Sequence, residues 1–214
     1  MTEHATRVLE QLKTLPEFAE LTEENCTITR LGGLTNLVHR VDCAAGSVIV
    51  RIPGDGTEEY IDRAVQITNA NAAPAAGVSP EVLWAEAKTG VMISTAVPGI
   101  TTMTPANFKT ITGAAGRAGK ALAQLHNSGE TFEFRFELFA MIDDYLKILS
   151  TKDVDLPDGY HDVVKAAEPV KAALAANPAP LAPCHCDPLS ENFLDDGSKM
   201  WIVDWEYSGM NDPL

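Results

Sequence analysis

Residues 183–194, PCHCDPLSENFL, gather several side chains whose types and spacing could do chemistry. His185, Asp187 and Asn192 fit the pattern His-x-Asp-x-x-x-x-Asn, and Asp204 follows at the end of the apolar segment MWIV. In a phosphoryl-transfer site, one carboxylate orients the attacking hydroxyl and accepts its proton, while an amide oxygen and a second carboxylate ligate Mg²⁺. The spacing therefore predicts Asp187 as a catalytic base and Asn192 and Asp204 as metal ligands.

The same stretch admits two other interpretations. Taken singly, its polar residues could be ordinary loop residues that cap turns. Cys184, His185 and Cys186 are of types that bind zinc, but consecutive ligands can hardly converge on one tetrahedron, and the other cysteines, Cys26 and Cys43, offer no closely spaced pair. We expect free thiols, and we expect His185 to brace the loop by hydrogen bonds rather than to perform chemistry.

A second candidate site combines a glycine turn with an arginine. Residues 32–36, GGLTN, lie between two expected strands. Gly33 would let the backbone come close to a ligand, and Thr35 and Asn36 offer hydrogen bonds to phosphate oxygens. Arg51 ends the next strand as a fixed cation that can pair with phosphates. Either feature alone is typical of a hairpin turn or an exposed arginine, but together they predict a phosphate-binding site.

The elements that must position these residues fall into two groups, which predict an α+β fold. The first group contains five strands of an antiparallel sheet, of which the first three form a meander. Its helix at 57–72 begins with Thr57 as N-cap and places Tyr60, Ile61, Ala64 and Ile67 on one side. We expect the strands at 27–31, 37–43, 48–53, 81–86 and 90–97, and an amphipathic helix at 4–14.

The second group is mostly helical. Thr104 and Pro105 are a typical N-cap and first residue of a helix, and Gly129 is a typical stop. The alanine-rich run between them predicts one helix that ends near His126. Two further helices are expected at 136–150 and 158–176, and a tight β-hairpin at 193–204.

Composition narrows the partners. The 214 residues include 30 acidic and 16 basic side chains, a formal net charge of −14 that would repel a phosphate backbone, so we expect no nucleic acid partner. The same acidity suits a cationic substrate, but it is weak evidence for one, because most acidic proteins are acidic only for solubility. The start, MTEHATRVLEQL, is charged where a signal peptide needs an apolar segment, and no window approaches the ~20 apolar residues of a membrane helix. We expect a cytoplasmic protein without a membrane partner.

Six segments, taken in order, resemble the choline/ethanolamine kinase family within the aminoglycoside-phosphotransferase-like, protein-kinase-like group. They are GGLTN, VIVRIPG, ISTAVPG, LHNSG, HCDPLSENF and VDWEYSGMNDP, and they cover about residues 27–214. RIPG with DWEYSGMNDP resembles bacterial-type choline kinases more narrowly. The resemblance implies a bilobal kinase-like fold, with a nucleotide-binding N-lobe at 1–97 and a catalytic C-lobe at 98–214. It also implies transfer of the γ-phosphate of ATP, with Mg²⁺, to a small-molecule hydroxyl, first of all that of choline.

The resemblance implies the same roles for Asp187, Asn192, Asp204 and Arg51 as the spacing does, and it adds further site residues. The backbone of Thr95 and Val97 would hold the adenine. Tyr207 would line the substrate pocket, where an aromatic face can attract a quaternary ammonium. Glu206 would add a counter-charge there, or would serve as a structural anion of the loop.

One departure concerns the counter-charge of Arg51. Such kinases carry a glutamate on the helix of the N-lobe, and here that position corresponds to Gln66. Gln66 can donate or accept hydrogen bonds but cannot neutralise Arg51, so the arginine would be less firmly placed. Glu59, two turns earlier on the same expected helix, could substitute, although a solvated surface glutamate is its default interpretation.

A second departure is the ending. Family members continue past the NDP segment into helices that close the C-lobe, whereas this chain stops at Leu214. We expect a fragment of a longer protein or a truncated product. Apolar surface would then be exposed where those helices would pack, and the chain would self-associate, for example as a homodimer. The alternative functions are phosphorylation of ethanolamine or an aminoglycoside, and a catalytically impaired module that only binds a nucleotide.

Overall fold

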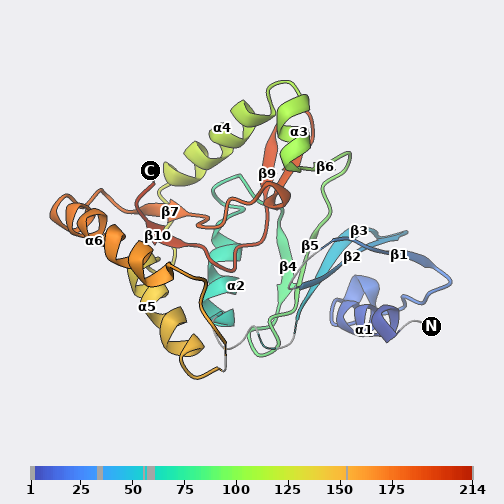
Figure 1. Cartoon of the computed structure of the whole chain (residues 1–214). Helices are drawn as coiled ribbons and strands as arrows, with labels where there is room; N and C mark the ends of the chain where they lie inside the picture. Colours follow the sequence, from blue (N-terminus) through green and yellow to red (C-terminus); the bar gives the residue numbers. More distant parts are fainter. Residues whose placement is uncertain (1–2, 33–35, 55, 57–60, 153, 214) are drawn as a thin grey trace.

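The computed structural model of the protein describes residues 3–32, 36–54, 56, 61–152 and 154–213. Helices and antiparallel sheets share the chain, as the predicted α+β class requires. The larger sheet lies at one side of the molecule with the first helix against it, and two helices of the second half lie at the opposite side (Figure 1). Among the described residues, no helix is both long and apolar enough to cross a membrane.

The five-stranded sheet has the order β1-β2-β3-β5-β4 with antiparallel pairing throughout. Its strands are β1 (Cys26–Arg30), β2 (Asn36–Cys43), β3 (Gly46–Pro53), β4 (Val82–Ala85) and β5 (Met92–Thr95). Val48, Val50 and Ile52 alternate along β3 and are buried. Helix α1 (Glu3–Leu12) adds its own buried side chains to the core that they form. The five predicted strands are confirmed.

Helix α2 (Arg63–Ala72) begins later than predicted. The predicted start and cap, Thr57, and Tyr60 lie outside the described residues, but Ile61 is not helical. The N-cap is Asp62, whose carboxylate accepts hydrogen bonds from the backbone N–H groups of Ala64 and Val65. A carboxylate that satisfies two first-turn donors is a stronger cap than a threonine further upstream, so the predicted boundary was wrong by six residues.

The second core lies around helix α4 (Ala114–His126), whose alanines and Leu125 form a buried stripe at helical spacing. The predicted single helix up to His126 is two helices, because Gly113 has a φ of 77°, which no helix accommodates. The first piece, α3 (Pro105–Thr110), has the predicted cap, since the Thr104 hydroxyl accepts from Asn107 N–H. The short α3 therefore turns against α4 instead of extending it.

The predicted hairpin is confirmed as β8 (Phe193–Asp195) and β9 (Met200–Ile202), and a short strand β6 (Thr101–Thr102) extends it into three strands. Strand β6 was not predicted, nor were two further strands. They are β7 (Ala182–Cys184) and β10 (Gly209–Asn211), which pair antiparallel and bring the chain before the catalytic loop beside the chain after the hairpin.

The second core also includes Ala70, Ala73, Ala76 and Val78, from α2 and the loop after it. The backbone N–H of Ile202 on β9 donates to Val78 O at 2.8 Å. Helix α2 thus shares a core with the hairpin, and it also lies beside β4 of the five-stranded sheet (Figure 1). The division of the chain at residue 97 stays a prediction, but the packing joins α2 to the second half.

Helices α5 (Leu138–Leu149) and α6 (Tyr160–Ala176) confirm the last two helical predictions to within two residues. Neither helix contains a buried residue. Large apolar side chains on and beside them are exposed. They include Leu138, Leu149, Val154, Val163, Val170 and Leu174.

Candidate active site

The loop between β7 and β8 holds the first pair of candidate residues together. The 3₁₀ helix η3 (Ser190–Asn192) places Asn192 so that its Nδ2 donates to the Asp187 backbone oxygen at 2.9 Å and to the Asp187 carboxylate at 3.3 Å. Because both partners can only accept, the amide nitrogen of Asn192 faces Asp187 and its oxygen faces away. The carboxylate of Asp187 is thereby oriented, and an amide oxygen is left to bind something else.

His185 braces this loop, as predicted. It is almost fully buried, its Nε2 lies 2.9 Å from Val203 O, and its Nδ1 accepts from Asp187 N–H at 3.3 Å. A carbonyl can only accept and an amide N–H can only donate, so the ring is neutral with its proton on Nε2. Burial lowers the pKa of His185 and so keeps the ring neutral, although the nearby carboxylates act in the opposite direction. The His185 ring also packs edge-on against Trp205, with the ring centroids 4.8 Å apart.

The two thiols beside His185 are unsuited to bind zinc. Both ring nitrogens of His185 are already engaged in hydrogen bonds. Burial raises the pKa of the Cys186 thiol to about 12 and also raises that of Cys184, so both stay protonated at neutral pH. Both cysteines are free, as predicted.

Asp204 follows β9 in an unusual backbone conformation. Its φ is 69°, in the left-handed region that non-glycine residues rarely adopt. The preceding N–H, of Val203, donates to Asn192 O at 3.0 Å, which joins the start of the hairpin to its end. Backbone strain of this kind clusters at functional sites, where surrounding bonds over-determine it. The strain here aims the Asp204 carboxylate out of the strand and toward Arg51.

Arg51 brings the sheet to the same place. Its Nη2 contacts the carboxylates of both Asp204, at 3.1 Å, and Glu206, at very short range. Glu206 also accepts from Asn36 Nδ2 at 3.3 Å. Burial, and the negative charge of Asp204, raise the pKa of Glu206, while Arg51 opposes that rise. One arginine from β3 therefore meets two acidic side chains from the segment after β9.

Several buried polar atoms at this point have no hydrogen-bond partner among the described residues: Arg51 Nε, Arg51 Nη1 and Asp204 Oδ1. The Asp204 oxygen is close to Arg51 but out of line for a hydrogen bond. Buried polar groups are nearly always satisfied, so unsatisfied ones point to a missing ligand. An amide oxygen from Asn192 and a carboxylate from Asp204 suit a hard cation such as Mg²⁺, and the open guanidinium nitrogens suit phosphate oxygens. The residues present fit both groups.

Two of the predicted phosphate-binding residues, Gly33 and Thr35, lie outside the described residues. The two residues predicted to hold the adenine help to line a cavity of about 630 Å³, whose lining includes Thr95, Val97, Pro80 and Trp201. Thr95 N–H is already bonded to Glu81 O at 2.9 Å, whereas the Val97 N–H makes no hydrogen bond within the described chain. Of the two predicted adenine contacts, the Val97 N–H is the donor that is open.

Gln66, which by residue type could hydrogen-bond Arg51, makes no bond to it among the described residues. Gln66 is buried on α2, where its Oε1 accepts from Arg63 on the same helix at 3.0 Å. The other candidate counter-charge, Glu59, lies outside the described residues. The Gln66 side chain is thus engaged by Arg63, one turn away on α2, and gives Arg51 no support among the described contacts.

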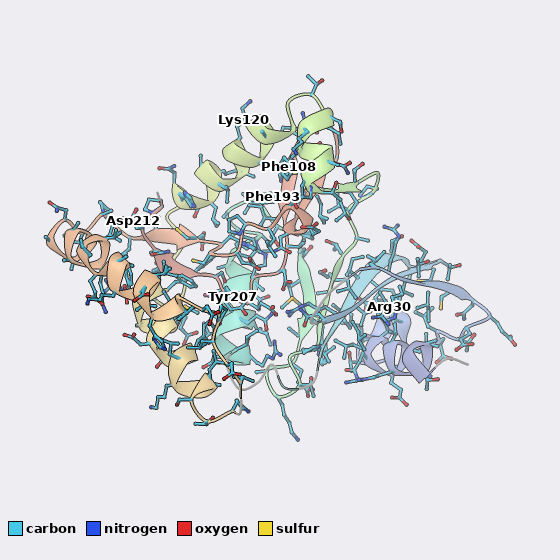
Figure 2. The ribbon with its side chains drawn as sticks, in the orientation of Figure 1. Arg30, Phe108, Lys120, Phe193, Tyr207 and Asp212 are labelled. Carbon is cyan, nitrogen blue, oxygen red and sulfur yellow. The ribbon has the colours of Figure 1, made fainter. Side chains whose placement is uncertain are left out.

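Tyr207 lies beside helix α2 (Figure 2). The next residue, Ser208, is fixed there because its carbonyl accepts from Asn69 Nδ2 at 2.9 Å. Asn69 is completely buried on α2, and its Oδ1 accepts from Glu133 N–H at 3.0 Å. The sequence analysis missed Asn69. The sequence feature that could have indicated its role is a polar residue next to the alanines on the inner face of α2.

A second residue pair that the sequence did not reveal supports the hairpin. Arg117 on α4 donates from Nε to Asp195 at 2.8 Å and also pairs through Nη2. This interaction lowers the pKa of the Asp195 carboxyl. Nearby, Phe108 packs edge-on against Phe193, with the ring centroids 5.9 Å apart. Figure 2 labels both residues, which lie side by side. The strand that follows Asn192 is thus held from two sides.

A family model described as "Phosphotransferase enzyme family" matches residues 27–214. The chain belongs to this family. A choline/ethanolamine kinase family protein from Mesorhizobium loti is 55% identical, and the match covers 98% of this chain and 67% of that one with a TM-score of 0.84. This relative places the phosphotransferase chain in the choline/ethanolamine kinase family, as the motifs suggested.

Two further comparisons concern proteins called LicA. Protein LicA from Haemophilus influenzae is 27% identical over 202 residues, which cover 92% of this chain but 58% of LicA. The chain therefore spans less than two thirds of that curated relative. Choline kinase LicA from Streptococcus pneumoniae is 22% identical with a TM-score of 0.83, covering 99% of this chain and 72% of that one. That likeness confirms the predicted bilobal, kinase-like fold of the phosphotransferase.

Proposed function

We propose that the protein is a kinase that transfers the γ-phosphate of ATP to the hydroxyl of a small amino alcohol, with choline as the first candidate. Membership of the choline/ethanolamine kinase family supports the reaction class. The name of the Streptococcus pneumoniae relative, a choline kinase, supports choline. The net charge of −14 is compatible with a cationic substrate. A cytoplasmic location is part of the same proposal.

One observation carries the proposal. The bonds Asp187–Asn192, Asn192–Val203 and Arg51–Asp204 form a continuous link between a candidate base, a candidate amide ligand, a candidate carboxylate ligand and a cation. Phosphoryl transfer depends mainly on such positioning and on neutralisation of charge, since the protein supplies little covalent chemistry. The link brings these groups together from three separate segments of the chain.

In this proposal each side chain has one task. Asp187 is oriented by Asn192 Nδ2 and accepts the hydroxyl proton of the alcohol, while the alcohol oxygen attacks the γ-phosphorus of ATP. Arg51 Nε and Nη1 donate to phosphate oxygens, and Val97 N–H donates to the adenine. Asn192 and Asp204 would hold Mg²⁺, which when bound neutralises the charge of the β- and γ-phosphates. Tyr207 would face the ammonium group of the alcohol.

The test is a coupled assay of ADP release, over choline, ethanolamine and an aminoglycoside, with the longest natural chain that contains these residues. We expect turnover with choline, and we expect Asp187→Asn to lower kcat by at least ~100-fold, as for loss of a general base. Glu191→Gln removes an exposed carboxylate of the same loop and serves as the matched control with unchanged kcat. Turnover that survives Asp187→Asn would refute the assigned mechanism.

Calorimetric titration with ATP and Mg²⁺ separates the remaining alternatives. Asp187→Asn should still bind ATP, because Arg51 and Val97 are untouched. Nucleotide binding by the unaltered protein with no turnover of any alcohol would favour the impaired, binding-only module. Turnover of ethanolamine or an aminoglycoside in place of choline would keep the reaction class and change the substrate.

A further inference from the structure

Arg51 needs a counter-charge, and the described residues of its own half of the molecule do not supply one. Its side chain is only 11% exposed. A buried guanidinium without a carboxylate is costly, and kinases of this general type supply the carboxylate from the helix of the N-lobe. Here that helix offers Gln66, which is neutral and is bonded to Arg63. Among the described residues, the carboxylates that reach Arg51 are those of Asp204 and Glu206.

These two carboxylates differ in what else they can do. Glu206 Oε2 accepts hydrogen bonds from both Arg51 and Asn36, and its side chain is 6% exposed. Asp204 has a side chain that is 29% exposed, and its buried Oδ1 has no aligned donor among the described residues. Glu206 is therefore committed to the protein, whereas Asp204 is open to a ligand. A side chain as buried and bonded as Glu206 is poorly placed to meet the ammonium group of a substrate.

We propose that Glu206 is the positioning residue that fixes Arg51 for the nucleotide, in place of a carboxylate at the position of Gln66 on α2. It holds one end of the guanidinium through Nη2 and leaves Nε and Nη1 for phosphate oxygens. Because Asn36 lies on β2 and Arg51 on β3, Glu206 also ties two strands of the sheet to the segment that carries Asp204. This assignment rests on the proposed function, and it replaces the role of Glu206 as a counter-charge for the substrate.

The experiment measures KM for ATP and for the alcohol separately in Glu206→Gln, which keeps the size of the side chain and removes its charge. We expect KM for ATP to rise about 10- to 100-fold, as for loss of a buried charge-assisted pair, with KM for the alcohol within twofold of its original value. Glu206→Asp keeps the charge at a shorter reach and should give an intermediate KM for ATP. A rise confined to KM for the alcohol would overturn the assignment in favour of a substrate contact.

Gln66→Leu is the matched control. Gln66 is about as buried as Glu206 but bonds Arg63 and not Arg51, so its loss should leave KM for ATP within twofold. If Gln66→Leu raised KM for ATP as much as Glu206→Gln does, α2 would supply the positioning and the proposal would be wrong. Thermal unfolding of each variant identifies any that do not fold, and Glu206→Asp then provides the decisive comparison.

Calorimetric binding of ATP keeps this test independent of the proposed reaction. Should the protein phosphorylate no alcohol, Glu206→Gln is still expected to bind ATP about 10- to 100-fold more weakly than the unaltered chain. Equal binding by the two folded proteins would refute the role of Glu206, whatever the outcome of the alcohol assay. Failure of the reaction and failure of this inference are thus distinguishable.

Discussion

Helices α4 and α6 show how differently two parts of this chain are packed. Helix α4 has four buried residues along its 13 and lies against the hairpin that carries Asn192 and Asp204. Helix α6 is longer, with 17 residues, and none of them is buried. Most of the stability of a helix in a protein comes from packing of its apolar face. The candidate catalytic residues are therefore attached to the well-packed part, and the α5–α6 part is the less stabilised.

The difference also explains how the site is held. Ile202, Trp205 and Ser208 each hydrogen-bond α2 or the loop after it, so the segment around Asp204 is fixed to this element at three points. Nothing comparable links α6 to the site within the described residues. The candidate chemistry thus depends on the central core, and changes in α6 should affect it little. The predictions below test this contrast, from the largest expected effect to the smallest.

The strongest contrast is between two leucines. Leu125 on α4 is fully buried, and Leu174 on α6 is 50% exposed. We expect Leu125→Ala to lower the free energy of unfolding by about 2–5 kcal/mol, through lost burial and the cavity it leaves. Leu174→Ala should change it by less than about 0.5 kcal/mol. Urea unfolding of both variants measures this difference, and equal effects would contradict the contrast between the helices.

Asn69 tests the cross-links of the central core. Asn69→Leu removes the partners of Ser208 O and Glu133 N–H in a fully buried place. We expect a loss of about 1–3 kcal/mol of unfolding free energy, because buried polar groups are left unsatisfied. Asn71→Ala is the control, since Asn71 is exposed on the same helix and bonds only its own turn. A loss as large in Asn71→Ala would show that the effect does not come from the buried bonds of Asn69.

His185 gives the central core a dependence on pH. Its folded pKa lies below the usual 6.5 because of burial, so below about pH 6.5 the unfolded chain takes up a proton that the folded chain does not. Stability from the neutral ring is present above that pH and is lost as pH falls, by at most about 1.4 kcal/mol per pH unit. Urea midpoints between pH 7 and 5 should fall less steeply in His185→Gln. His161→Gln, on the exposed surface of α6, should keep the original slope.

Much of this arrangement is local in the sequence and was predicted from it. The alternating apolar residues of β3 and the turn before β9 need only their neighbours in the chain, so the strands and hairpin were found. The bonds of Asn192 to Asp187 also lie within one short loop. Non-local pairings were missed, because no local pattern specifies them. The pairing of β7 with β10 joins segments some 25 residues apart, and Glu206 reaches Arg51 across most of the chain.

The boundaries failed for a related reason. Asp62 and Thr57 are both acceptable N-caps by residue type, and only the bonds actually made by Asp62 decide between them. By residue type Gly113 does not differ from Gly116 and Gly119, which lie inside α4, but its positive φ ends one helix and begins another. Where two local signals compete, residue type alone does not decide between them, and the backbone conformation has to be seen.

The smallest expected effect on stability is at the exposed face of α6. Val163, Val170 and Leu174 lie one above another at helical spacing, and each is at least half exposed. Exposed apolar stripes favour association, so we expect a protein of these 214 residues to self-associate as concentration rises, in sedimentation velocity. Replacing the three residues with Lys, Glu and Lys should reduce association and leave the thermal midpoint unchanged. Ala115→Glu, on the exposed side of α4, is the control, and association that persists in the triple variant would place the contact elsewhere.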